Sequence, residues 1–202
     1  MKFTLAALLA VSGALAAPTP EAPGIPTTAN ARTQLAALTV AASTNTGTYD
    51  RDLFPHWNTV SGTCNTREYV LMRDGTNVVT NSACASTSGS WYSPYDGATW
   101  TAASDVDIDH MVPLQNAWIS GAAAWTTAKR TLFANDITRP QLWAVTDEVN
   151  SAKSSSPPDQ WKPPLTSFYC KYAKSWVAVK SYWELTVTSA EKSALTTMLN
   201  TC

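Results

Sequence analysis

The sequence predicts a single domain of the α+β class. Strand character on both sides of the turn pair Asp74-Gly75 indicates a β-hairpin. Apolar residues recur at helical spacing over residues 165–183, and Thr188 with Glu191 forms a capping box that begins a last helix. A hairpin and several helices in a chain of 202 residues are typical of a small α+β protein with one core.

The N-terminal 48 residues are expected to lie outside this domain. Lys2 precedes an apolar run, residues 3–11, and small residues follow up to Ala17. This order is typical of a secretory signal peptide, which we assign to residues 1–17. Residues 18–48 begin with a stretch rich in Pro and Ala, and we expect a leader, propeptide or linker with one short helix. The domain itself is expected to cover residues 49–202.

Composition and charge limit the classes of protein to which the chain can belong. Hydrophobic residues make up 45% of the chain and charged residues 14%, which excludes a disordered protein. No apolar segment is long enough to span a bilayer, so we expect a soluble, extracellular protein that acts away from membranes. The net charge of −1 argues against a nucleic-acid-binding protein, because such domains are often basic.

The first half of the domain is expected to contain a hairpin, a loop and a strand. Residues 67–73 and 77–81 are the two predicted hairpin strands. Residues 86–98 are rich in Ser, Gly, Tyr and Trp and are predicted to be a loop. A strand is expected from about residue 105 to His110, ending before Pro113.

The second half is expected to be mostly helical. Its patterns predict helices at residues 114–119, 122–133 and 165–183 and from residue 189 onward. A short apolar run, residues 142–145, is a strand candidate. A short helix follows it and carries Asn150 and Lys153. The last two helices are expected to form a helical hairpin.

The four cysteines of an extracellular protein should be paired, and four cysteines allow three connectivities. Cys64 and Cys84 lie almost equally far from the predicted turn at Asp74-Gly75. Cys170 and Cys202 lie equally far from position 186, where the helical hairpin would turn. These symmetries predict the disulfides Cys64–Cys84 and Cys170–Cys202.

The chemistry is concentrated at Asp109-His110, with Asn150 on a later helix. Hydrolysis of a phosphodiester needs an activated water and a cation on the phosphate. Asp109, the amide oxygen of Asn150 and water suit magnesium, and His110 would then be free to take the water's proton. From the residues alone, an ordinary histidine paired with a neighbouring carboxylate explains Asp109-His110 equally well, so both interpretations stay open.

A set of short motifs, in order along the chain, resembles the secreted HNH endonuclease family related to the C-terminal domain of GmrSD-type restriction enzymes. The resemblance is firm over residues 49–164. The motifs are Arg51-Asp52-Leu53-Phe54-Pro55-His56-Trp57, Thr66-Arg67-Glu68, Trp91-Tyr92-Ser93-Pro94-Tyr95-Asp96-Gly97, Asp109-His110-Met111-Val112-Pro113-Leu114, Ala117-Trp118, Ser120-Gly121-Ala122, Arg130, Phe133-Ala134-Asn135-Asp136, Leu142, Asn150, Lys153, Pro157 and Trp161-Lys162-Pro163.

The resemblance implies a ββα-metal finger as the nuclease core, between the N-terminal β-hairpin and the C-terminal helical hairpin. Its first strand would end at Asp109-His110, its second would lie near residues 142–145, and its helix would carry Asn150. The resemblance further implies a metal-dependent endonuclease that acts on DNA or RNA. Magnesium is the expected divalent metal, with manganese or another ion as the alternative.

The sequence departs from the HNH pattern at two positions. The last position is Asn150 instead of histidine, and the middle position is uncertain. Asn135 is the nearest candidate for the middle position, where a polar residue would orient the loop that carries the base.

Further residues are assigned with an ordinary alternative beside each. Arg130 is expected to clamp the scissile phosphate, or else to be a solvated helix charge. Arg67 is a tentative phosphate ligand beside Glu68, or the two merely pair on the hairpin. Lys153 lies on the same helix face as Asn150, where phosphate contact and simple solvation are equally expected. His56, between Pro55 and Trp57, is expected to be structural.

Three functions remain in competition. The leading one is a monomeric, secreted endonuclease with little sequence specificity, since nothing in the chain resembles a base-reading helix. A metal-dependent phosphodiesterase for small substrates would suit the net charge of −1. A non-catalytic secreted effector or binding protein with the same fold is the third, although it would have no need of a base beside a metal site.

Overall fold

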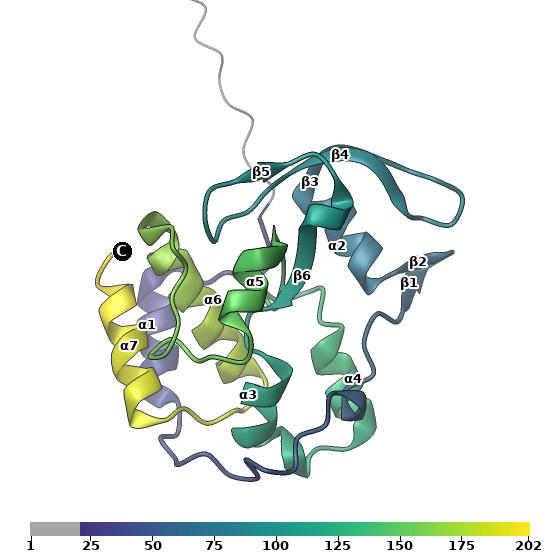
Figure 1. The fold of residues 1–202 in the computed structure, drawn as a ribbon. Coiled ribbons are helices and arrows are strands. Elements are labelled where there is room, and N and C mark those ends of the chain that lie inside the picture. The colour runs from purple at the N-terminus through teal and green to yellow at the C-terminus, as the bar shows by residue number, and fades with distance from the viewer. Residues whose placement is uncertain (1–20) are drawn as a thin grey trace, which may run out of the picture.

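The computed structural model describes residues 21–202, so the predicted signal peptide, residues 1–17, lies outside the described residues. The described part is an α+β fold with small antiparallel sheets (Figure 1). Its strands are β1 (Thr59–Ser61), β2 (Cys64–Asn65), β3 (Gly75–Thr80), β4 (Ser86–Tyr92), β5 (Thr99–Trp100), β6 (Val106–His110) and β7 (Leu142–Thr146). Its α-helices are α1 (Thr28–Ala37), α2 (Thr66–Asp74), α3 (Leu114–Ile119), α4 (Thr127–Ala134), α5 (Asp147–Lys153), α6 (Tyr169–Tyr182) and α7 (Ser189–Leu199).

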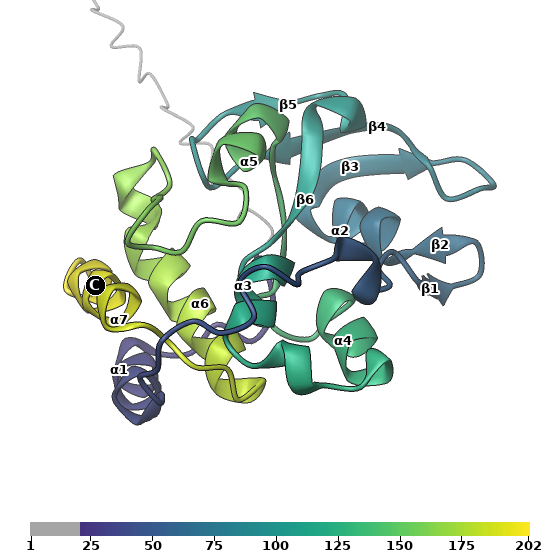
Figure 2. The same ribbon diagram turned by 60° about the horizontal axis from the view of Figure 1, so that its bottom comes forward.

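The strands and the long helices occupy different sides of the molecule. Figure 1 shows α1, α6 and α7 together on one side and β3, β4 and β5 on the other, with β6 and α5 between them. Figure 2 shows the segment between α1 and β1 running past α3 toward α2. The strand β6 therefore lies where the two sides meet.

The predicted strand–strand–helix order around Asp109-His110 is present. Strands β6 and β7 pair antiparallel from Val106 opposite Thr146 to His110 opposite Leu142. Every residue of β7 is buried, as expected for an apolar strand covered on both faces. Helix α5 begins directly after β7, so it returns along the same strand pair. This order brings the α5 side chains back beside the end of β6.

The predicted hairpin at residues 67–81 is wrong, because its first strand is helix α2. Asn65 caps α2 and Glu68 completes a capping box with it, which starts a helix where the turn signal suggested a strand. At the other end, the buried Asp74 carboxylate accepts a hydrogen bond from the backbone N–H of Ala144 on β7. Asp74 is thus held by a long-range contact and does not form a tight turn.

The hairpin that does form joins β3 to β4. Residues 86–92, expected to be part of a loop, are therefore a strand. The reason is the buried Trp91, whose indole N–H donates to the Leu71 carbonyl on α2. A Cβ atom at Gly75 or Gly89 would lie 2.6 Å or 2.7 Å from the Trp91 ring, so both glycines allow this close approach.

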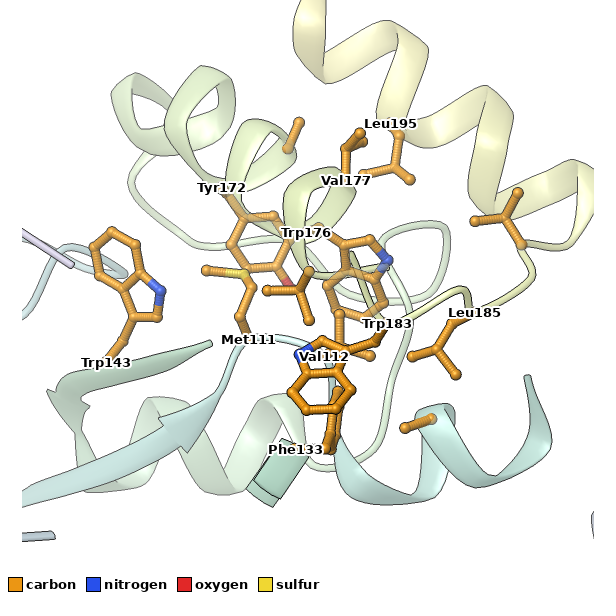
Figure 3. Packing of buried hydrophobic residues seen from close by; sticks show 14 of the residues in the cluster. Met111, Val112, Phe133, Trp143, Tyr172, Trp176, Val177, Trp183, Leu185 and Leu195 are labelled. Carbon is orange, nitrogen blue, oxygen red and sulfur yellow. The ribbon is translucent and has the colours of Figure 1, made fainter. Parts of the chain in front are cut away.

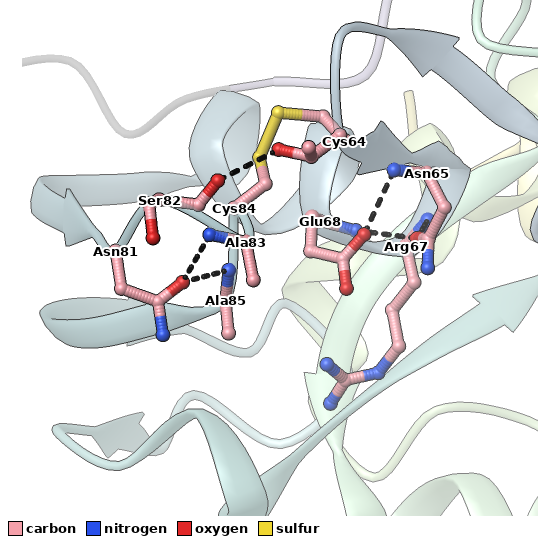
Figure 4. The surroundings of a disulfide bond; sticks show 10 residues. Cys64, Asn65, Arg67, Glu68, Asn81, Ser82, Ala83, Cys84 and Ala85 are labelled. Carbon is pink, nitrogen blue, oxygen red and sulfur yellow. Dashed lines mark hydrogen bonds between the residues drawn. A yellow bond between two sulfur atoms is a disulfide. The ribbon is translucent and has the colours of Figure 1, made fainter.

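Both predicted disulfides are confirmed. Cys64–Cys84 joins β2 to the turn between β3 and β4, and Cys170–Cys202 joins α6 to the residues after α7. In the turn between β3 and β4, the Asn81 side chain accepts hydrogen bonds from the backbone N–H groups of Ala83 and Ala85 (Figure 4). The pairing of Cys64 with Cys84 was therefore predicted correctly from a hairpin placed at the wrong turn.

The predicted helical hairpin of α6 and α7 is also confirmed, and α1 packs against both helices. Ala31 and Leu35 of α1 are buried in the main core. The Arg32 guanidinium donates to the Leu199 carbonyl, and Lys192 donates to the Ala36 carbonyl. The segment in which we expected a leader, propeptide or linker thus contributes a helix to the core.

Large side chains fill the core between the helices and the end of β6 (Figure 3). Met111 and Val112 follow β6 directly, are fully buried and belong to the cluster that contains Trp176 and Trp183. Their burial anchors the chain just after His110. Within residues 21–202, no helix has both the length and the apolar character needed to cross a membrane.

Candidate active site

A polar pocket of about 380 Å³ lies at the end of β6. Its lining includes Asp109 and His110 from β6, Gln115 from α3, Asn150 from α5 and Arg51 from the segment before β1. The pocket brings together three of the residues for which the sequence predicts chemistry, Asp109, His110 and Asn150.

The end of β6 is fixed by the chain segment before β7. The backbone N–H of Met111 donates to the Gln141 carbonyl. The Gln141 side chain pairs with both backbone groups of Val112, at 3.0 Å and 2.9 Å. Because Gln141 is itself fully buried, these bonds hold the backbone after His110 in one path.

One nitrogen of the His110 ring forms a hydrogen bond with the protein, and the other forms none among the described residues. Its Nε2 lies 2.8 Å from the backbone carbonyl oxygen of Ala134 at the end of α4. A carbonyl only accepts hydrogen bonds, so Nε2 carries the hydrogen and donates it. In a neutral ring Nδ1 then has the lone pair, which is the arrangement that a general base needs.

Burial keeps His110 neutral. The pKa of His110 is lowered to about 3; burial is the largest cause, the positive charge of Arg51 adds to the lowering, and the hydrogen bond to the Ala134 carbonyl opposes it. His110 is 5% exposed, so a charged imidazolium would lose most of its hydration there. The ring is therefore neutral across the ordinary pH range.

A tryptophan covers the His110 ring. The Trp57 ring stacks on it with centroids 5.6 Å apart and an angle of 29° between the planes. Trp57 has a φ of +59°, a left-handed conformation that costs a bulky residue roughly 1–3 kcal/mol. Such a conformation persists only where the surrounding contacts impose it.

Asn135 supplies those contacts. Its Oδ1 accepts from the backbone N–H of Asn58 at 2.9 Å, and its Nδ2 donates to the Pro55 carbonyl at 2.9 Å. Both sides of Trp57 are thereby tied to the end of α4. Because the neighbouring Ala134 binds His110, this one helix end positions both His110 and the ring that covers it. The sequence predicted that Asn135 orients the loop that carries the base; the loop that Asn135 holds carries Trp57 instead.

Asp109 lies in a buried network beneath the pocket. Its carboxylate forms an ion pair with Lys153 at 2.7 Å and accepts a hydrogen bond of 2.5 Å from the Tyr95 hydroxyl. Lys153 also donates to the His110 carbonyl at 2.9 Å. Burial raises the pKa of Asp109, and the charge of Lys153 opposes the shift. The network ties α5 to the last two residues of β6.

Asn150 lies on the pocket side of α5 but bonds a different aspartate. Its Nδ2 donates to a carboxylate oxygen of Asp107 at 2.9 Å. Asp107 and Asp109 share one face of β6, because strand residues two apart point the same way. The bond leaves the Asn150 carbonyl oxygen without a hydrogen-bond donor among the described residues.

The pocket has two oxygen ligands of the kind that a hard cation takes, although residues 21–202 contain no group of three or more His, Cys, Asp or Glu side chains that could hold a metal. Asp109 and Asn150 offer oxygen atoms only, which magnesium prefers, and few protein ligands leave room for water. A carboxylate has about four lone-pair sites. The two contacts with Lys153 and the one with Tyr95 occupy three of them. Asp109 can therefore still offer one site, and Asn150 its free oxygen.

Three other residues lie elsewhere than the sequence suggested. Arg130 donates to the carbonyls of Leu53 and Trp125 and does not line the pocket, contrary to the expected phosphate clamp. Arg67 donates to the carbonyl of Val106, also outside the pocket.

The third residue is Lys153. Its ammonium group is fully buried against Asp109, contrary to the expected phosphate contact. Glu68, which the sequence placed only beside Arg67, completes the α2 capping box.

Sequence reasoning missed Arg51, Tyr49 and Gln115, which line the pocket. Arg51 stands at the start of one resembling motif, which was its only signal. Its position depends on Phe54, which is fully buried, and on the bond from Arg130 to the Leu53 carbonyl. His56 does not line the pocket, and its Nδ1 lies 2.8 Å from the Phe54 carbonyl oxygen.

Comparison with known proteins agrees with this picture. Residues 65–198 match the family described as GmrSD restriction endonucleases, C-terminal domain. An uncharacterized secreted protein of Arthroderma benhamiae is 61% identical over 204 residues, and the match covers 100% of both chains. No solved structure gives a significant match. The full-length secreted relative and the two disulfides identify the chain as a secreted protein.

Proposed function

The chain belongs to the GmrSD restriction endonuclease C-terminal domain family, and we propose that it is a secreted, metal-dependent endonuclease that hydrolyses phosphodiester bonds of DNA or RNA with little sequence specificity. One observation carries the proposal. His110 is neutral, donates through Nε2 to a carbonyl, and lines a polar pocket together with Asp109 and Asn150.

His110 is the general base. A water in the pocket gives its proton to the Nδ1 lone pair while its oxygen forms a bond to phosphorus. The bond from phosphorus to the leaving oxygen breaks, and that oxygen takes a proton from solvent. The Ala134 carbonyl and the Trp57 ring hold the imidazole in place during the transfer. Such a base contributes about 10²–10⁴-fold to a rate.

Arg51 and the oxygen ligands have different electrostatic roles, one toward the phosphate and the other toward the metal. Arg51 is exposed at the pocket, and we assign to it the phosphate contact that the sequence suggested for Arg130. Asp109 and Asn150 would hold the divalent metal, with magnesium as the first choice. When bound, the metal polarises the phosphate and stabilises its developing negative charge. Lys153 and Tyr95 orient the Asp109 carboxylate.

A cleavage assay tests the proposal. We expect the secreted protein to nick plasmid DNA or to cleave RNA with magnesium and to lose this activity with EDTA. The small diester bis(p-nitrophenyl) phosphate, run beside them, shows whether a nucleic acid is required. His110→Ala should reduce cleavage at least about a hundredfold while leaving the fold intact.

His56→Ala is the comparison variant, because His56 is the other histidine and packs against His110 without lining the pocket; it should lose much less activity than His110→Ala. Near-normal cleavage by folded His110→Ala protein would overturn the assignment of the base. Cleavage that is insensitive to EDTA would overturn the metal dependence. Titration with magnesium should restore part of the rate of Asn150→Ala but none of the rate of His110→Ala.

A further inference from the structure

A second polar cavity adjoins the active-site pocket. Its volume is about 190 Å³. Gln115 from α3 and Ser155 from the segment after α5 line both hollows, so the two are neighbours across these residues. A substrate whose phosphate lies beside His110 would therefore present its next chemical group to the second cavity.

The charges in the second cavity disfavour a phosphate. Its charged lining residues are Asp159, Lys180 and Glu191, two carboxylates against one ammonium. Lys180 and Glu191 are buried and pair with each other at 2.6 Å. In contrast, Arg51 lines the first pocket and forms no ion pair among the described residues. An uncharged group suits the second cavity, and the anionic phosphate suits the first.

The polar groups in the cavity match the edge of a nucleobase. Three amide side chains line it, those of Gln115, Asn116 and Gln160. An amide offers a donor and an acceptor side by side, as base edges also do. Because amides can present either group, such a set accepts more than one base, in keeping with low sequence specificity.

Asn116 has an unused hydrogen-bonding group at this place. It is 4% exposed, and its side-chain oxygen has no hydrogen-bond partner among the described residues. Buried amides are nearly always satisfied, so the unpaired oxygen of Asn116 in this cavity needs a partner from outside the chain, which is a water or a group of a ligand.

Resting on the proposed function, we propose that the second cavity binds the nucleobase next to the scissile phosphate, with Asn116 as a binding residue. A base can enter the cavity only if it is neither paired nor stacked within a duplex. The enzyme should therefore prefer single-stranded nucleic acid to the same sequence in a duplex.

The test compares two substrates and matched variants. The substrates are a single-stranded oligonucleotide and bis(p-nitrophenyl) phosphate, which has no base. Asn116→Leu should lower kcat/KM for the oligonucleotide about tenfold, the value of one hydrogen bond, and affect the small diester far less. Gln34→Leu is the matched control, because Gln34 also has a buried, unpaired amide oxygen but lines neither cavity.

Gln160→Ala is a second test variant, because Gln160 lines the second cavity, is exposed and does not contribute to the core. It should also lower oligonucleotide cleavage selectively. The proposal is overturned if Asn116→Leu lowers both activities equally, if neither variant changes the ratio, or if the wild type cleaves a duplex as fast as the single strand.

If the wild type cleaves neither substrate, the proposed function fails by itself. Fluorescence anisotropy of a labelled single-stranded oligonucleotide in EDTA then decides the present inference. Weaker binding by Asn116→Leu than by Gln34→Leu supports the base site, and equal binding overturns it.

Discussion

Lys153 and Lys180 are both fully buried, and each forms an ion pair with a buried carboxylate. Glu191, the partner of Lys180, also accepts from the Trp176 indole and caps its own helix α7, so its contacts with Lys180 and Trp176 join α7 to α6. Asp109, the partner of Lys153, keeps a free lone-pair site and lines the active-site pocket. One pair fastens two helices, whereas the other places a functional carboxylate.

Burial of a charged pair does not by itself identify a functional site. The two pairs have the same chemistry and nearly the same exposure. They differ in the pocket that they face: Asp109 lines the pocket that contains His110, whereas Lys180 and Glu191 line the second cavity.

Removal of either lysine should destabilise the fold but affect catalysis differently. Lys153→Met and Lys180→Met each leave a buried carboxylate without its cation, which typically costs about 3–5 kcal/mol. Only Lys153→Met should reduce cleavage of the small diester by the protein that remains folded. Urea unfolding and single-turnover assays measure the two quantities. Equal loss of activity in both variants would show that the pairs do not differ in role.

Acid should destabilise the site through His110. The folded protein protonates His110 only near its pKa of about 3, whereas the unfolded chain does so near 6.5. Between these values the unfolded chain binds more protons, so stability falls as the pH falls, by up to about 4 kcal/mol at the lower end.

His110→Gln removes this titration. Urea unfolding of both proteins at about pH 7 and about pH 4 should show a shallower decline in stability for the variant. Parallel declines would mean that His110 is not buried as described.

The disulfides should matter for stability and not for catalysis. Cys170–Cys202 closes a segment of 32 residues and Cys64–Cys84 one of 20. Replacing either pair with serine should cost about 3 kcal/mol in the chain-entropy account, slightly more for the longer loop. The kcat of the folded variants should stay near that of the wild type, since no cysteine lines the active-site pocket. A collapse of kcat at unchanged stability would connect that disulfide to the site.

Loss of the tryptophan cover should give the smallest effect. Trp57→Ala removes the ring that stacks on His110, and such stacking contributes about 0.5–1.5 kcal/mol. A kcat up to about tenfold lower is expected, with little change in KM. Trp57→Phe keeps an aromatic ring and should restore most of the rate. No rescue by phenylalanine would mean that stacking is not what positions the base.

The sequence was most informative where local pattern and tertiary contacts agree. The capping box at Thr188 and Glu191, the apolar strand β7 and the helix with Asn150 all form as expected. The turn signal at Asp74-Gly75 failed because the Asp74 side chain is recruited by Ala144, 70 residues away. A window of a few residues does not contain that contact.

The pocket was predictable at Asp109, His110 and Asn150, which the resembling motifs placed together, while their chemical roles stay predictions. It was not predictable at Arg51 or Trp57, because both depend on a loop that is held by Asn135 from the far end of α4. Residue type also does not reveal that the Arg130 guanidinium donates its hydrogen bonds to backbone carbonyl groups. That outcome follows from its burial among Phe54, Trp118 and Trp125.

The position of α1 has a consequence for proteolytic nicking. Residues 42–48, which connect α1 to the rest of the chain, are all exposed and suit a protease. A cut there would not release α1, because Arg32 of α1 donates to the Leu199 carbonyl and Lys192 donates to the Ala36 carbonyl of α1. Val40 also forms a bridge with Val187. The product would be a two-piece protein that stays together in native gels and separates only on denaturation.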